Sequence, residues 1–204
     1  MASASLDPET IRENFPNPTI PIIHGTPHYF SIAEAHAPLN KNATSVYSSC
    51  VNPALGHYIL TLLDAKYLLR SGIAFIIPFN PGVHPGVAPG ATDAQISHTK
   101  RKHEESTHEF RLFKAVDNAL KNQHFNAIDD IYIKDLRDRV TGFATRSVRD
   151  ILQYLYQTYG SVMTAQLTAN DERFRAPYDG STDLEAYSNG IGDCIFMADK
   201  ANQP

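Results

Sequence analysis

The chain lacks tryptophan, has only two cysteines and contains no long run of apolar residues. Cys50 and Cys194 are too few and too far apart for a disulfide framework or a zinc site, so we expect reduced thiols. The longest apolar stretch, residues 73–79, is far shorter than the roughly 20 residues that cross a bilayer. Because no basic segment followed by an apolar run opens the chain, we also expect no signal peptide, no membrane partner and a cytoplasmic location.

Positive charge is limited as well. The chain has 18 lysine and arginine residues against 22 acidic ones, which gives a formal net charge of −4. Proteins whose main task is to hold nucleic acid usually carry clustered positive charge. The only basic cluster contains Lys100, Arg101 and Lys102, and Glu104 and Glu105 follow at once and weaken its field. We predict at most a weak RNA contact through these three basic residues, and otherwise a solvated helix.

Nine histidines are present, but their spacing forms no recognisable metal site. His98, His103 and His108 are spaced by five, which rotates successive side chains by roughly 140° on a helix, so they cannot converge on one ion. His103-Glu104 begins like a zinc-protease motif, which needs its second histidine four residues after the first. We therefore predict an exposed polar helix here and no metal.

The other catalytic patterns are incomplete. The Pro-Gly pairs within residues 81–90 are not followed by the Gly-Lys-Ser/Thr of a phosphate loop, and Gly190-x-Gly192 lacks the third glycine of a dinucleotide fingerprint. No serine occupies a G-x-S-x-G elbow. The carboxylates of residues 129–138 alternate with basic residues, which favours a solvated, ion-paired face. We predict no catalytic residue, no cofactor and no small-molecule substrate, and therefore no enzyme.

Several helices have clear start or stop signals. Residues 31–34, 92–95 and 182–185 each place Ser or Thr three positions before Glu or Gln, the capping-box pattern that opens a helix. A short helix is predicted from Asp64 to Arg70, with Gly72 just past its end.

The first capped helix carries a regular apolar stripe, formed by Ile32, Ala35, Leu39, Ala43 and Val46. Pro38 interrupts this stripe and should kink or split the helix, because it removes a backbone donor. The apolar run at 73–79 is compatible with a short strand or with an extended core segment. Further on, the pairs Asp130/Lys134 and Asp135/Arg139 have the acid-first spacing of four that stabilises a helix.

The long helix that begins after Thr92 has two unlike halves. Residues 97–109 include no apolar side chain, so this half is expected to be solvated or to touch a partner. The apolar stripe resumes at Phe110, Phe113, Val116 and Leu120. The clearest amphipathic pattern follows in residues 148–159, with Val148, Ile151, Leu152, Leu155 and Tyr159 on one face and Gly160 closing the helix. Two further helices are predicted, through residues 167–174 and from 184 onward, the latter with a stripe formed by Leu184, Tyr187, Ile191, Ile195 and Ala198. The chain is predicted to be all-α.

The order of these elements resembles a known family. Ala119-Leu120 lies in the long helix, residues 148–159 form the amphipathic helix, residues 167–174 follow, and Leu184-x-x-Tyr187 opens the last helix. This succession resembles the Gag (capsid) protein of copia-type LTR retrotransposons. The phrase VTGFATRSVRDILQYLYQTYG and the early segment HGTPHYFSIAEAHAPLNKNATSV are similar to Gag-like reading frames of protist and algal retroelements.

The resemblance implies a multi-helix capsid-like bundle that assembles with copies of itself around element RNA. Its parts are expected to be a flexible arm at 1–20, an N-terminal lobe at 21–160 with a Pro-Gly linker at 81–91, and the start of a second lobe at 161–204. Many family members carry a zinc knuckle downstream, C-x-x-C-x-x-x-x-H-x-x-x-x-C, which is absent here. In the family further helices usually follow the position of Pro204, so we expect a truncated copy.

The predicted function is therefore a Gag-like structural protein that self-associates as a homo-oligomer, with weak or indirect RNA association. The alternative is a domesticated helical adaptor that binds a host protein and has no catalytic activity. In that case the 97–109 helix and the Pro-Gly loop would supply the contact surface.

Overall fold

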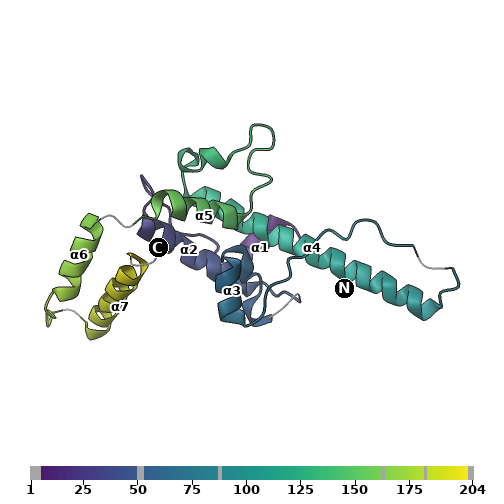
Figure 1. Cartoon of the computed structure of the whole chain (residues 1–204), viewed down its shortest axis with the longest axis horizontal. Coiled ribbons are helices and arrows are strands. Elements are labelled where there is room, and N and C mark those ends of the chain that lie inside the picture. The colour runs from purple at the N-terminus through teal and green to yellow at the C-terminus, as the bar shows by residue number, and fades with distance from the viewer. Residues whose placement is uncertain (1–5, 50–52, 87–88, 162–163, 182, 202–204) are drawn as a thin grey trace.

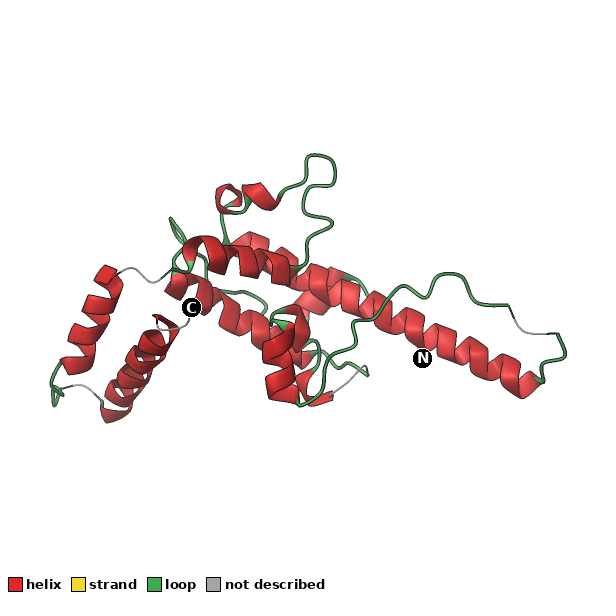
Figure 2. Ribbon diagram, viewed as in Figure 1, coloured by secondary structure: helices red, strands yellow, loops and turns green. Residues whose placement is uncertain are grey.

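Helices make up the regular structure of this chain. The computed structural model describes residues 6–49, 53–86, 89–161, 164–181 and 183–201, and within these ranges it has seven α-helices and no β-strand (Figures 1 and 2). The helices are α1 (Pro8–Glu13), α2 (Tyr29–Ser45), α3 (Asp64–Ser71), α4 (Asp93–Ala127), α5 (Val148–Tyr159), α6 (Thr164–Arg175) and α7 (Leu184–Ala201), with 3-10 turns η1 (Pro53–Leu55), η2 (Tyr58–Leu60), η3 (Asp130–Tyr132) and η4 (Lys134–Leu136) between them. The predicted all-α, multi-helix fold is confirmed.

The core lies where α2 and α5 pack beside the second half of α4 (Figure 1). The apolar residues predicted to line α5 are buried, apart from Tyr159, which is half-buried. Two clusters of buried side chains result, and α2 and α5 contribute to both. One gathers Leu39, Leu120 and Leu152 with their neighbours, and the other gathers Ile32, Ile151 and Leu155.

Buried polar groups of α4 hold the start of α5 in place. Ser147 and the third residue of α5 form a capping box. The buried Asp117 carboxylate accepts a hydrogen bond from the Val148 amide at 2.9 Å, and burial raises the pKa of Asp117. Nearby, the Lys121 ammonium donates to the Arg146 carbonyl at 2.9 Å. The α4–α5 junction is therefore fixed by hydrogen bonds as well as by apolar packing.

Helix α2 differs from its prediction in two ways. It begins at Tyr29 with His28 as its N-cap, so Ser31 is the third helical residue and completes the capping box from the other side. The helix is not split at Pro38, which lies inside it. The stripe on both sides of this proline is fully buried, and burial of several such side chains outweighs the roughly 3 kcal/mol that an internal proline costs.

The predicted flexible arm is wrong for its described part, residues 6–20. This part contains α1, which packs on α4, and Phe15, which is buried. Asn42 donates to the Asn17 carbonyl at 2.8 Å and to the Gln123 side-chain oxygen at 2.9 Å, so the segment is fastened to both α2 and α4. The prolines of this segment favour a loose chain. The side-chain amides of Asn42 and Gln123 nevertheless donate hydrogen bonds to its backbone carbonyls and hold it in place.

The acid-first pairs predicted at residues 130–139 do not stabilise an α-helix. This segment folds into the two 3-10 turns η3 and η4 and then a tight turn that bridges Asp138 and Gly142. A 3-10 turn places residues i and i+3, and not i and i+4, above one another. The Asp138 carboxylate instead accepts hydrogen bonds from the amides of Val140 and Thr141 at 2.8 Å each, and these bonds lower the pKa of Asp138.

Helices α6 and α7 pack against each other beside the main bundle (Figure 1). The stripe predicted for α7 is out of phase, because Leu184 and Ile195 are exposed whereas Cys194 is buried. The buried Asn170 amide of α6 donates to the Cys194 carbonyl at 2.9 Å. The capping residue predicted for α7, Thr182, and the other cysteine, Cys50, lie outside the described residues.

Candidate interaction surface

Apolar side chains are exposed on α3 and on the segment that follows it. Helix α3 ends as predicted at Gly72, whose φ of +73° is the left-handed conformation that glycine adopts most readily. We call the following set the apolar face. It comprises Leu63, Leu68, Leu69, Ile73, Ile76, Ile77, Phe79 and Val83, each between 44% and 92% exposed. The run at 73–79 therefore forms no strand, and most of its side chains are exposed.

Three aromatic rings in contact with one another hold the apolar face against the bundle. Tyr67, the one buried residue of α3, meets Phe75 edge to face at 5.6 Å, and Phe75 lies 6.0 Å from Phe113 of α4. Phe75 is the member of the 73–79 run that packs on the core. Tyr67 and Phe75 thus attach the segment that carries the exposed apolar side chains to the bundle, and Leu63 and Ile77 line clefts at its edge.

The apolar face exposes a large total area. Its eight residues are spread along 63–83, and their exposed surfaces add up to roughly 900 Å². A stable protein–protein interface buries about 800 Å² on each partner. The apolar face is thus large enough to form most of such an interface.

The first half of α4 is a second exposed feature, which we call the α4 arm (residues 93–109). It begins with the predicted capping box at Thr92 and extends beyond the bundle (Figure 1). The apolar stripe takes over after it, where Phe113, Val116 and Leu120 are buried. The predicted division of this helix into a polar half and a core half is confirmed.

The structure places the predicted RNA-contact residues Lys100, Arg101 and Lys102 on this arm, all exposed. Lys100 lies 4.0 Å from Glu104, and Arg101 lies 3.7 Å from Glu105. Such exposed pairs contribute only a few tenths of a kcal/mol each, but they place a negative charge beside two of the three cations. RNA contact through this cluster remains a prediction.

One side of the α4 arm is covered by the loop that returns from the apolar face. The ring of His84 meets the ring of His103 edge to face at 5.0 Å. Thr99 and Thr107, which share that side of the helix, are half-buried. On another side, Glu104 and His108 line a pocket together with Leu6 of the N-terminal segment, and Ser49 donates to the Glu109 carboxylate.

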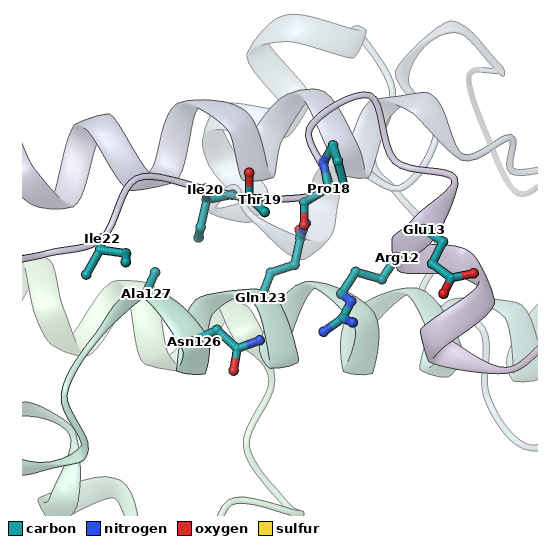
Figure 3. A pocket seen from close by; sticks show the side chains of 9 residues that line it. All are labelled: Arg12, Glu13, Pro18, Thr19, Ile20, Ile22, Gln123, Asn126 and Ala127. Atoms are coloured by element: carbon teal, nitrogen blue, oxygen red, sulfur yellow. The ribbon is translucent and has the colours of Figure 1, made fainter.

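A pocket lies between the N-terminal segment and α4, with a volume of about 420 Å³ (Figure 3). Gln123 reaches across from α4, and its amide donates to the Asn17 carbonyl at 2.8 Å and to the Pro18 carbonyl at 2.9 Å. Arg12, at the other end, pairs with Glu9. Gln123 thus ties the N-terminal segment to α4, whereas the Arg12–Glu9 pair lies within α1. These polar groups of the pocket are bonded within the protein.

A smaller cleft of about 280 Å³ lies between α2, α3 and α5. His36 Nε2 lies 2.9 Å from the Thr61 carbonyl, which only accepts, so Nε2 carries the proton and Nδ1 accepts from the Tyr156 hydroxyl at 3.1 Å. Arg149 pairs with Asp64 at 2.6 Å. The His36, Tyr156 and Arg149 side chains thus already bond within the protein.

Two histidines, His57 and His124, are buried in the bundle, and a third, His36, is half-buried at the cleft. Burial lowers the pKa of His36 and of His57, and lowers that of His124 from 6.5 to about 4. His124 is fully buried, and within the described part of the chain neither of its ring nitrogens has a hydrogen-bond partner. The His124 ring is therefore neutral at pH 7 and, like His57, belongs to the core.

The described ranges contain no group of three or more His, Cys, Asp or Glu side chains arranged to hold a metal ion. Over the same ranges, no helix combines the length and the apolar character needed to cross a bilayer. The class that the fold defines is an all-α, multi-helix protein with a large exposed apolar face. Comparison with known protein families, with curated proteins and with solved structures finds no match for this chain.

Proposed function

We propose that this protein is a Gag-like structural protein that self-associates into capsid-like assemblies. The apolar face is the observation that carries the proposal. Water-exposed apolar surface is unfavourable by about 25 cal/mol per Å², so covering this face with a second copy favours association. The resemblance to copia-type Gag, which extends over nearly the whole sequence, supports the same function.

A second copy fits this surface for two further reasons. The exposed area matches what one partner contributes to a standard interface. The face is also held on the bundle by Tyr67 and Phe75, so little conformational freedom is lost when it docks. RNA association in this proposal stays weak or indirect, because the basic residues of the α4 arm lie among acidic ones.

Charged substitutions on the apolar face test the proposal. Leu69→Lys and Phe79→Lys alter side chains that are 86% and 79% exposed and carry little of the fold. We expect each variant to weaken self-association at least tenfold, because a lysine ammonium would be buried at the interface. Sedimentation equilibrium over a concentration series measures the change, and circular dichroism checks the helix content.

Val140→Lys is the matched control, because Val140 is 92% exposed but lies in the 138–142 turn, away from the apolar face. It should associate like the unmodified protein. If all three variants self-associate as strongly as the unmodified protein does, the proposal is wrong. That result would favour the alternative, a helical adaptor that binds a different protein.

A further inference from the structure

We propose that the α4 arm pairs with the α4 arm of a second copy in antiparallel orientation, about a two-fold axis level with residue 103. This inference rests on the proposed self-association and names a second contact surface for it.

The arm presents one regular row of side chains. His98, Arg101, Glu105 and His108 are spaced by three, four and three, the spacing that keeps residues on the contact face of paired helices. All four are exposed. His103 lies roughly half a turn away, on the side that the loop bearing His84 already covers. His108 lies beside Leu6 of the N-terminal segment, whereas His98, Arg101 and Glu105 lie away from both that segment and the loop and remain free for a partner.

The row is self-complementary only when the second copy runs in the opposite direction. Reversal about residue 103 places Arg101 opposite the partner's Glu105, and symmetry repeats this ion pair. The same reversal places His98 opposite the partner's His108, and Lys102 opposite the partner's Glu104. A parallel arrangement in the same register would instead place Arg101 against Arg101 and Glu105 against Glu105.

The charges of this row are available to a partner. The side chains of Arg101 and Glu105 are 70% and 67% exposed, and their mutual distance of 3.7 Å is a loose contact. The axial distance between residues 98 and 108 is about 15 Å at 1.5 Å per residue, so the contact is short. Charge pairs of this kind set orientation and partner choice more than affinity. The apolar face would supply most of the binding, and the arm would fix the orientation of the two copies.

Charge exchange tests this arrangement. Arg101→Glu alone places glutamate against glutamate twice, and Glu105→Arg alone places arginine against arginine twice. We expect each variant to weaken self-association at least tenfold at low salt. The double variant Arg101→Glu/Glu105→Arg restores opposite charges across the axis and should recover the affinity to within about threefold. It also changes the base-first order of this pair to the acid-first order, which favours the helix and protects helix content.

Arg139→Glu, with the same change of net charge at an exposed position outside the arm, should have little effect. Sedimentation equilibrium in 50 mM and 500 mM salt measures all variants, with circular dichroism as the folding check. Single variants that associate like the unmodified protein, or a double variant that does not recover, would overturn arm pairing while leaving association through the apolar face intact. An unmodified protein that stays monomeric would overturn both.

Discussion

The two halves of α4 have the same backbone conformation and opposite surroundings. In the second half, apolar residues recur at helical spacing and α2 and α5 cover them. The first half lacks such residues and meets only the loop that carries His84 and, near its end, Leu6 and Ser49 within the described residues. The helix as a whole is continuous, so its packed half supports an arm that contributes little to the core. The comparison teaches that a helix can be extended beyond its bundle to place a polar surface at a fixed distance.

The largest expected difference between the halves is in stability. Leu120→Ala removes a fully buried side chain from the core and should lower the free energy of unfolding by about 2–5 kcal/mol. Arg101→Ala, on the arm, should change it by less than about 0.5 kcal/mol. Urea unfolding followed by circular dichroism measures both. Equal effects would show that the arm is as tightly coupled to the core as the second half.

A second prediction concerns pH. The pKa of His124 falls from 6.5 in the unfolded chain to about 4 in the folded protein, so the unfolded state binds the proton more readily between these values. The contribution of neutral His124 to the free energy of unfolding is therefore fully present above pH 6.5. It decreases by about 3 kcal/mol as the pH falls toward 4. His36 and His57 shift in the same direction and add to the loss.

His124→Leu should remove part of this acid sensitivity. Its free energy of unfolding at pH 8 should stay equal or rise, because the leucine leaves no unpaired polar atom in the core. Unfolding titrations at pH 8, 6 and 4.5 give the comparison. A variant as acid-sensitive as the unmodified protein would show that His124 does not carry the effect.

The smallest expected changes in the free energy of unfolding come from removing two helix caps. Ser147 opens α5, which is packed on the core, and Thr92 opens the α4 arm; both form capping boxes. Ser147→Ala should lower the global free energy of unfolding by about 1 kcal/mol. Thr92→Ala should have a smaller global effect, because the arm can fray locally, and faster hydrogen exchange should appear in residues 93–100 alone. Equal global costs would contradict independent fraying of the arm.

Local signals in the sequence predict much of the fold. The cap at Thr92, the stop at Gly72 and the stripe on α5 each depend on nearby residues, so a local pattern is enough to find them. The start of α2 escapes this approach because His28 is an uncommon capping residue.

The remaining features depend on contacts between distant residues. The ordering of residues 6–20 requires Asn42 and Gln123, which come from α2 and α4. The apolar face also depends on such a contact. The sequence shows an apolar run at 73–79, but the packing of Phe75 on Phe113 determines which side chain of the run turns inward. Composition alone favours burial of the whole run, which is why its exposure was not predicted. The polar side of the α4 arm, by contrast, follows directly from the sequence.

Self-association is the central claim, and the weight-average mass of the unmodified protein tests it most directly. Multi-angle light scattering over a concentration series, with negative-stain images of the heaviest fraction, provides this measurement. We predict a mass that rises with concentration above the 22.6 kDa of one chain, together with closed or ring-like particles. A mass of one chain at every concentration would contradict the claim.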